Sequence, residues 1–141
     1  MQRRSDFLKG YYSILQYVPD PERAEAVNIG IVLFCRERNF LKAKTTKDHA
    51  RVIRFFGESP GLDLQRLTIF KQAFEERIAA EGIQTLAAFQ RFVDTRANQL
   101  RLIAPRPLKM AEPEEELAHL FALLVEVPQP ATDTAENLAA A

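Results

Sequence analysis

The sequence predicts an α+β fold in which helices pack on a largely antiparallel sheet of about four strands. Two apolar runs, residues 11–18 and 26–35, are rich in Tyr, Ile, Val and Leu and are separated by a short charged loop containing prolines, which predicts a β-hairpin. Residues 63–81 instead carry apolar side chains at steps of three and four, which predicts a long helix. The complete pattern predicts the order β-β-β-α-α-α-β-α.

The hairpin is expected at the centre of the sheet, because both faces of its two strands are largely apolar. Strict alternation places Val27, Ile29 and Ile31 on one face, and Asn28 and Gly30 on the other. Asn28 needs hydrogen-bond partners among such neighbours, and a glycine within a strand often marks a bulge or a close approach of two backbones.

The elements after the hairpin follow from their apolar spacing and from their start and stop signals. Residues 40–46 are predicted to form an edge strand, whose Lys42 and Lys44 discourage pairing with another chain. The other predicted elements are a short helix ending at Gly57, the helix at 63–81 closed by Gly82, a helix capped by Thr85 and ending near Asn98, a strand at 100–104 stopped by Pro105 and Pro107, and a helix starting at Pro113.

Length and composition predict one soluble domain over residues 1–127, followed by a disordered, acidic tail rich in Pro and Ala over 128–141. Apolar residues make up 47% of the chain, yet no run approaches the roughly 20 apolar residues that a membrane-spanning helix needs. Cys35 is the only cysteine, so it cannot form an intrachain disulfide, and its strand predicts a buried side chain. With no secretory signal in the first ten residues, we expect a cytoplasmic protein.

The formal net charge of zero conceals an uneven distribution. Residues 1–111 carry all 19 basic residues against 12 acidic ones, a net charge of +7, whereas residues 112–141 carry seven acidic residues and no basic one. This asymmetry is typical either of a basic surface for an anionic partner or simply of two segments that oppose aggregation.

Familiar catalytic and cofactor motifs are missing from the sequence. His49 and His119 lack the spacing of a metal or general-base motif, and no serine lies in a nucleophile elbow. The sequence also contains no GxGxxG or Walker loop. We therefore assign no catalytic, cofactor-binding or metal-binding residue and expect no cofactor.

The hairpin loop is the first candidate interaction site. We group it with the two polar exceptions on the second strand, so that the candidate consists of Asp20, Glu22, Arg23, Glu25, Asn28 and Gly30. Three carboxylates in six residues could also bind a hard cation such as Mg²⁺, although Arg23 among them favours a solvated loop or ion pairs that fix it for recognition.

A basic segment after the hairpin is the second candidate. It places seven cationic side chains within nineteen positions: Arg36, Arg38, Lys42, Lys44, Lys47, Arg51 and Arg54. These residues could follow a phosphate backbone, but no RNA-binding or helix-turn-helix motif accompanies them, and a solvated sheet edge is the alternative.

The hairpin sequence YYSILQYVPDPERAEAVNIGIVLF closely resembles the opening signature of a bacterial family, domain of unknown function 3037. NQLRLIAPRPL resembles the second recurrent segment of that family, and the resemblance extends over about residues 7–125. Ala24 departs from the family pattern, which more often has a glycine there, and this difference puts a tight turn at that position in doubt. Likewise, Ile103 and Ala104 precede Pro105 where a Thr-Pro pair is commoner.

Members of this family are often encoded beside a HipA-like kinase homologue. The resemblance therefore implies a small, non-catalytic accessory or regulatory protein that binds another protein, with such a kinase as a candidate partner. Nucleic-acid binding through the basic segment, in a defence or mobile-element system, is the alternative hypothesis.

Overall fold

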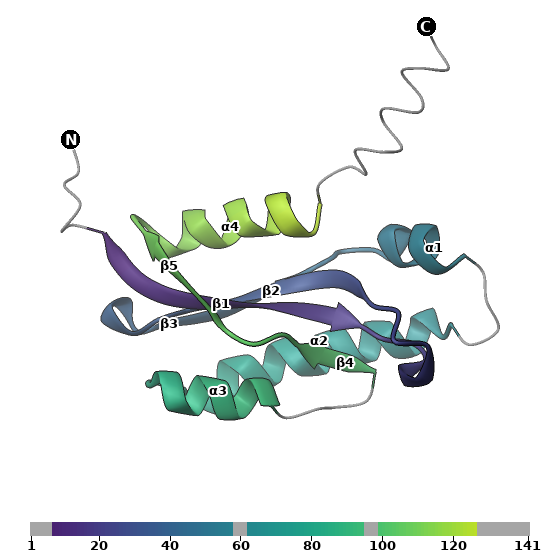
Figure 1. Ribbon diagram of the computed structural model, residues 1–141, viewed down its shortest axis with the longest axis horizontal. Helices are drawn as coiled ribbons and strands as arrows, with labels where there is room; N and C mark the ends of the chain where they lie inside the picture. The colour runs from purple at the N-terminus through teal and green to yellow at the C-terminus, as the bar shows by residue number, and fades with distance from the viewer. Residues whose placement is uncertain (1–6, 58–61, 95–98, 127–141) are drawn as a thin grey trace, which may run out of the picture.

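The computed structural model describes residues 7–57, 62–94 and 99–126. Within these residues the chain forms one five-stranded antiparallel sheet and four α-helices (Figure 1). In chain order the elements are β1 (Leu8–Tyr17), the 3-10 helix η2 (Pro21–Arg23), β2 (Val27–Cys35), the 3-10 helix η3 (Arg36–Arg38), β3 (Phe40–Thr45), α1 (Ala50–Phe56), α2 (Leu64–Glu81), α3 (Leu86–Asp94), β4 (Leu100–Leu102), β5 (Arg106–Met110) and α4 (Pro113–Leu124).

β1 is the central strand. Along one edge it pairs with β2, which in turn pairs with β3, and along its other edge it pairs with β5 near its start and with β4 near its end. The α+β class and the antiparallel sheet are confirmed, and β3 lies at the predicted edge. The order of elements agrees as well, except that the strand predicted at 100–104 is the shorter β4 and is followed by a second strand, β5, that was not predicted.

The second of these strands, β5, forms despite the prolines that were predicted to end pairing. It lies at the edge of the sheet, where a proline nitrogen can face away from the ladder without removing a needed hydrogen bond. In the gap between β4 and β5, the buried hydroxyl of Ser13 donates to Ile103 O at 2.6 Å, and Ile103 N donates to Ile14 O at 3.1 Å. The Ser13 side chain thus replaces part of the backbone pairing that is interrupted between β4 and β5.

Helices cover both faces of the sheet, as the two-sided apolar hairpin predicts. Figure 1 shows α4 on one face and α2 and α3 on the other, with α1 at one end of the sheet. The face toward α4 buries Ile14, Ile31 and Leu33 against Leu117 and Phe121. The opposite face forms two clusters, one around Leu15, Tyr17, Val27, Ile29 and Leu67 and one around Val32, Phe34, Ile78, Phe89 and Phe92.

A β-bulge interrupts the hairpin ladder near its loop. Leu15 pairs with Gly30 while the next residue, Gln16, pairs with Asn28, so Ile29 is an extra residue in β2. The predicted strict alternation is therefore wrong across this point: Ile29 packs toward Leu67 of α2, whereas Ile31 packs toward α4. The bulge directs Asn28 toward α4, away from the apolar cluster around α2.

Gly30, beside the bulge, allows β3 to approach closely. A Cβ atom at this position would lie 2.9 Å from Lys44 O and 3.1 Å from Thr45 Cγ2. Thr46 N also donates to Ile29 O at 2.9 Å, which satisfies the carbonyl of the extra residue. The strand glycine thus marks both of the features expected of it, a bulge and a close backbone approach.

The helix boundaries follow their predicted caps. Asp63 Oδ1 accepts from Arg66 N at the start of α2, Gly82 ends that helix in the left-handed region, and Thr85 Oγ1 accepts from Ala88 N in α3. The predicted end of α3 near Asn98 and the predicted tail at 128–141 lie outside the described residues.

Two predictions from composition concern burial and membrane association. The side chain of Cys35 is fully buried, as predicted. In the described part of the chain, every helix is too short or too polar to cross a membrane.

Candidate functional site

A row of polar side chains crosses three neighbouring strands at the bulge. Arg101 of β4 pairs with Gln16 of β1, which pairs in turn with Asn28 of β2. All three side chains are partly exposed. We call Arg101, Gln16 and Asn28 the polar ladder.

The hydrogen bonds of the polar ladder all run in one direction. Arg101 Nε donates to Gln16 Oε1 at 2.9 Å, and Gln16 Nε2 donates to Asn28 Oδ1 at 2.9 Å. Asn28 Nδ2 then donates to Leu124 O, at the end of α4, at 3.2 Å. Because a guanidinium can only donate, it sets the orientation of both amides, and the ladder ends on a helix carbonyl that lacks an intrahelical donor.

Arg51 of α1 makes a hydrogen bond to one residue of the polar ladder. Its Nε donates to the backbone carbonyl of Asn28 at 3.0 Å, and its side chain is half-buried. Burial, and to a smaller extent the nearby Arg54, lower the pKa of the Arg51 guanidinium from its ordinary value. Both causes oppose a positive charge, so a negative group placed beside Arg51 would be stabilised.

The first candidate interaction site divides into two parts. Asn28 lies in the polar ladder and Gly30 is buried beside β3, whereas the remaining four residues lie on the exposed loop around η2. Asp20 Oδ1 accepts from Glu22 N at 3.0 Å, and Arg23 Nε lies 2.8 Å from Glu25 Oε1. Two of the three loop carboxylates, those of Asp20 and Glu25, thus make local contacts.

Ala24 occupies the turn of this loop in the left-handed region, with φ of 55°. The tight turn that the alanine put in doubt is therefore present. A glycine would adopt this conformation without steric cost.

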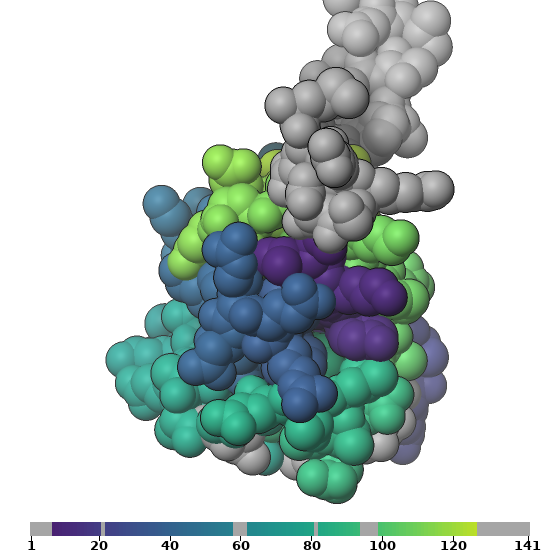
Figure 2. Space-filling model, turned by 90° about the vertical axis from the view of Figure 1, so that its left-hand side faces the viewer, coloured from purple at the N-terminus to yellow at the C-terminus, as the bar shows by residue number. Residues whose placement is uncertain are grey.

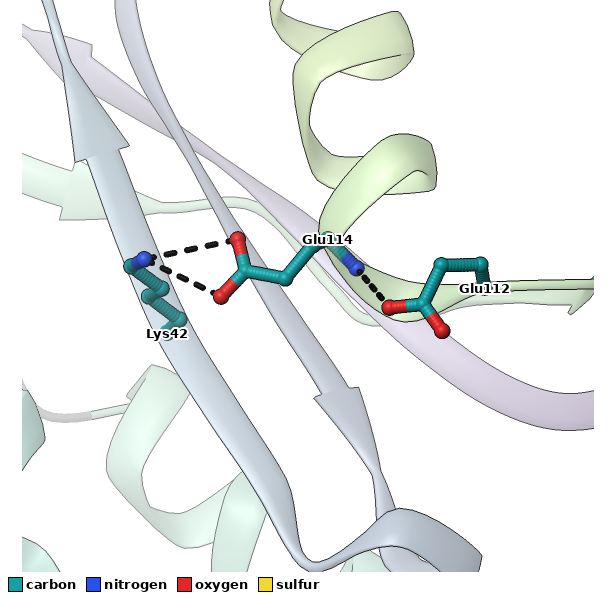
Figure 3. Close-up of polar contacts among 3 residues, drawn as sticks. All are labelled: Lys42, Glu112 and Glu114. Carbon is teal, nitrogen blue, oxygen red and sulfur yellow. Dashed lines mark hydrogen bonds and ion pairs between the residues drawn. The ribbon is translucent and has the colours of Figure 1, made fainter.

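The basic segment is also divided. Lys42 Nζ lies 3.1 Å from Glu114 Oε1, and the same Glu114 donates its backbone N–H to Glu112 Oε1 at 3.1 Å (Figure 3). Lys44 Nζ lies 4.9 Å above the ring of Phe121. Two of the seven cations thus fix α4 to the edge strand, and a third, Arg51, contacts β2.

The remaining four basic residues are exposed at two ends of the edge strand. Arg36 and Arg38 lie in η3, which projects between α4 and α3 in Figure 2, and Lys47 and Arg54 lie beyond the other end of β3. Next to η3 is an open hollow of about 300 Å³ lined by Phe34, Arg36, Asn39, Gln84 and Thr85. The structure therefore does not gather the seven residues into one patch.

A second polar cluster lies where β3 leads into α1 and meets α2. His49 Nε2 lies 2.7 Å from Thr68 Oγ1, whose own hydrogen is donated to Leu64 O at 3.0 Å. Thr68 therefore accepts from His49 Nε2–H, and the neutral ring carries no proton on Nδ1. This Nδ1 is buried and has no hydrogen-bond partner in the described part of the chain.

Lys71 lies beside this histidine with only 6% of its surface exposed. Its Nζ donates to Thr46 O at 2.7 Å and lies 3.2 Å from Thr46 Oγ1. Burial lowers the pKa of Lys71, while Asp48 and Glu75 act in the opposite direction. Burial and the charge of Lys71 also lower the pKa of His49, against the opposing effect of Asp48.

α1 presents large apolar side chains to solvent. Ile53 is 38% exposed and Phe55 is 51% exposed, although the rest of the helix packs inward through Val52 and Phe56. The ring of Phe55 meets that of Phe56 at 4.8 Å between centroids, and Phe56 meets the buried Tyr17 at 6.2 Å. A chain of aromatic rings thus supports the exposed Phe55 from the core.

Sequence reasoning identified Asn28 but not its partners. Gln16 could have been found from the hairpin, because it lies nearly opposite Asn28 once the strands are paired from the loop outward. Arg101 is distant in sequence, and no local pattern connects it with Gln16. Across residues 7–57, 62–94 and 99–126, no group of three His, Cys, Asp or Glu side chains is arranged to bind a metal ion.

Comparison with known proteins returns one match. The model of the family described as protein of unknown function, DUF3037, matches residues 12–125. No curated protein and no solved structure matches the chain at a significant level.

Replacing Asn28 by alanine is expected to lower the free energy of unfolding by about 1 to 2 kcal/mol, because Gln16 and Leu124 O both lose a partner. Urea denaturation of wild type and variant measures the change. Gln72→Ala removes an amide from the exposed surface of α2 and is expected to stay within about 0.5 kcal/mol of wild type. Equal effects of the two substitutions would show that the ladder adds nothing to stability.

Acidification is expected to destabilise the fold through His49. The pKa of this histidine is lower in the folded chain than its ordinary value of 6.5, so the unfolded chain binds more protons between these two values. Stability therefore rises with pH across that window and falls as the pH decreases through it. Denaturant titrations at about pH 7 and about pH 5 measure the loss.

The variant His49→Gln keeps a donor for Thr68 and removes the titrating ring, so its stability is expected to depend less on pH. His119→Gln, at an exposed position on α4, is the matched control and is expected to keep the wild-type dependence. If the stability of His49→Gln changed with pH in parallel with that of wild type, His49 would not be the source of the pH dependence.

Proposed function

The chain belongs to the DUF3037 family, and from that premise we propose that it is a non-catalytic accessory or regulatory protein that acts by binding another protein. One observation carries the proposal, namely the exposed ring of Phe55 on α1, beside two arginines. We call Arg51, Arg54 and Phe55 the α1 surface.

The composition of the α1 surface is typical of a binding site. Aromatic residues and arginine are enriched at protein interfaces and dominate their binding energy, particularly where an aromatic ring is rigidly held. Phe55 is held in this way by its contact with Phe56, and two arginines lie on the same seven-residue helix. The loop around η2, the surface expected from sequence, lies at the same end of the molecule (Figure 1).

The first partner to test is a HipA-like kinase, because the family resemblance implies that the two proteins are encoded together. We place the complex in the cytoplasm as part of the proposal. The single, fully buried cysteine is compatible with a reducing compartment.

Phe55→Ser is expected to weaken binding of the partner by about tenfold or more, because a supported aromatic ring is lost from the interface. The measurement is co-purification with proteins encoded nearby, followed by calorimetry with the partner obtained and with a HipA-like kinase. Ile69→Ser is the matched control, since Ile69 is 60% exposed on α2, on the opposite face of the sheet from α4. A chain that stays alone at micromolar concentration and leaves kinase activity unchanged would refute the proposal.

Nucleic-acid binding is the second candidate function. It is favoured by the four exposed basic residues at the two ends of β3, which are separated by roughly 20 Å along a six-residue strand. The acidic first turn of α4 beside Lys42 weakens this surface, because Glu114, Glu115 and Glu116 repel phosphate.

If this second function is correct, the affinity for a labelled DNA or RNA duplex will fall steeply with salt, with a slope of about 0.9 for each phosphate neutralised on logarithmic axes. Fluorescence anisotropy between about 50 and about 200 mM salt measures the slope. The double variant Arg36→Gln, Arg38→Gln is expected to reduce it. Absence of binding at the lowest salt would exclude the function.

A further inference from the structure

We infer that Arg101 of the polar ladder and Arg51, which donates to the backbone carbonyl of Asn28, form a recognition site for carboxylate groups on an extended, acidic segment of the partner protein. This inference rests on the proposed function and specifies the chemistry of the partner. It assigns a binding role to two half-buried arginines in addition to their hydrogen bonds within the fold.

The two guanidinium groups are held in fixed positions by the same short row of residues. Arg51 donates through Nε to Asn28 O, and Arg101 donates through Nε to Gln16 Oε1. Asn28 and Arg101 are separated by two strand spacings, or about 10 Å. Bonds at Nε orient a guanidinium and leave its terminal amino groups as the fork that binds a carboxylate.

Neither Arg51 nor Arg101 forms an ion pair with an acidic residue in the described part of the chain. For Arg51, partial desolvation and the neighbouring Arg54 both disfavour the positive charge. A carboxylate brought by a partner would relieve that unfavourable environment, and it would do so away from bulk water.

The α1 surface extends the site with an apolar contact. Arg51 and Phe55 are separated by four positions on the helix, so their side chains are neighbours on one face, with Cβ atoms about 5 to 6 Å apart. A segment that places an acidic side chain on Arg51 can therefore pack an apolar side chain on Phe55. This combination predicts a segment in which acidic and large apolar residues alternate.

An acidic protein segment fits this surface better than a nucleic acid does. The face of the sheet that carries the ladder is also covered by α4, whose first turn contains three glutamates. A phosphate backbone that continued along α4 would be repelled by these glutamates, whereas a short segment bound at the two arginines would lie near the other end of the helix, at Leu124, where salt largely screens them. The guanidinium fork is also matched in shape to a carboxylate.

The test is fluorescence anisotropy of the full chain with a fluorescein-labelled peptide of alternating Glu and Leu, compared with a peptide of alternating Gln and Leu. The Glu peptide is expected to bind about tenfold more tightly than the Gln peptide. Arg51→Gln and Arg101→Gln are each expected to weaken binding of the Glu peptide by about tenfold. Arg38→Gln removes an exposed arginine from η3 and is expected to bind like wild type.

Thermal unfolding of each variant is the control for correct folding. The two arginines lie on different elements, α1 and β4, so their variants are independent tests. Equal affinity for the two peptides, or unchanged affinity in both arginine variants, overturns the inference. Tighter binding of a labelled oligothymidylate through the same arginines also overturns it and favours nucleic acid.

Two outcomes separate this inference from the proposed function. If Arg51→Gln holds the partner protein as tightly as wild type while Phe55→Ser releases it, the acidic site is wrong and the protein-binding function stands. If the chain captures no partner but distinguishes the two peptides through Arg51, the acidic site is supported and the proposed function fails.

Discussion

The extra residue Ile29 in β2 determines which way the polar groups at this end of the sheet point. Without the bulge, Asn28 would face α2, on the side of the sheet that carries Leu15 and Leu67, and Val27 would turn toward α4. An unpaired amide in such surroundings costs about 1 to 3 kcal/mol. With the bulge, Asn28 faces α4, where Gln16 and Leu124 O provide its partners. One inserted residue therefore allows apolar packing on one face and a polar ladder on the other.

The bulge in β2 also helps to position α1. A helix of seven residues is too short to be stable alone, so its place depends on contacts with the sheet. Val52 and Phe56 provide apolar contacts, and Arg51 adds a hydrogen bond to the backbone of the residue that the bulge reorients. The contacts that hold α1 in place thus also hold the ring of Phe55 and the guanidinium of Arg51 at the surface.

Much of this architecture can be predicted from sequence, because apolar periodicity and capping are local properties. Asp63, Gly82, Thr85 and Pro113 mark helix ends by chemistry that depends on their immediate neighbours. β5 and the polar ladder depend instead on contacts between distant segments. A proline ends a strand only where its nitrogen would be needed for pairing, and this depends on which edge of the sheet the strand occupies. Likewise, an asparagine among apolar neighbours predicts that hydrogen-bond partners exist. It does not predict that one partner of Asn28 is the carbonyl of Leu124.

The position of β4 and β5 also has a consequence for synthesis of the chain. Ser13 and Ile103, which meet at the gap between these strands, are separated by 90 positions in the sequence. While the intervening residues are made, β1 can pair with β2 but its other edge has no strand to pair with. An unpaired apolar edge of this kind is a site for association with other chains, including chaperones. The central strand of the finished sheet is thus an edge strand until β4 and β5 have been made.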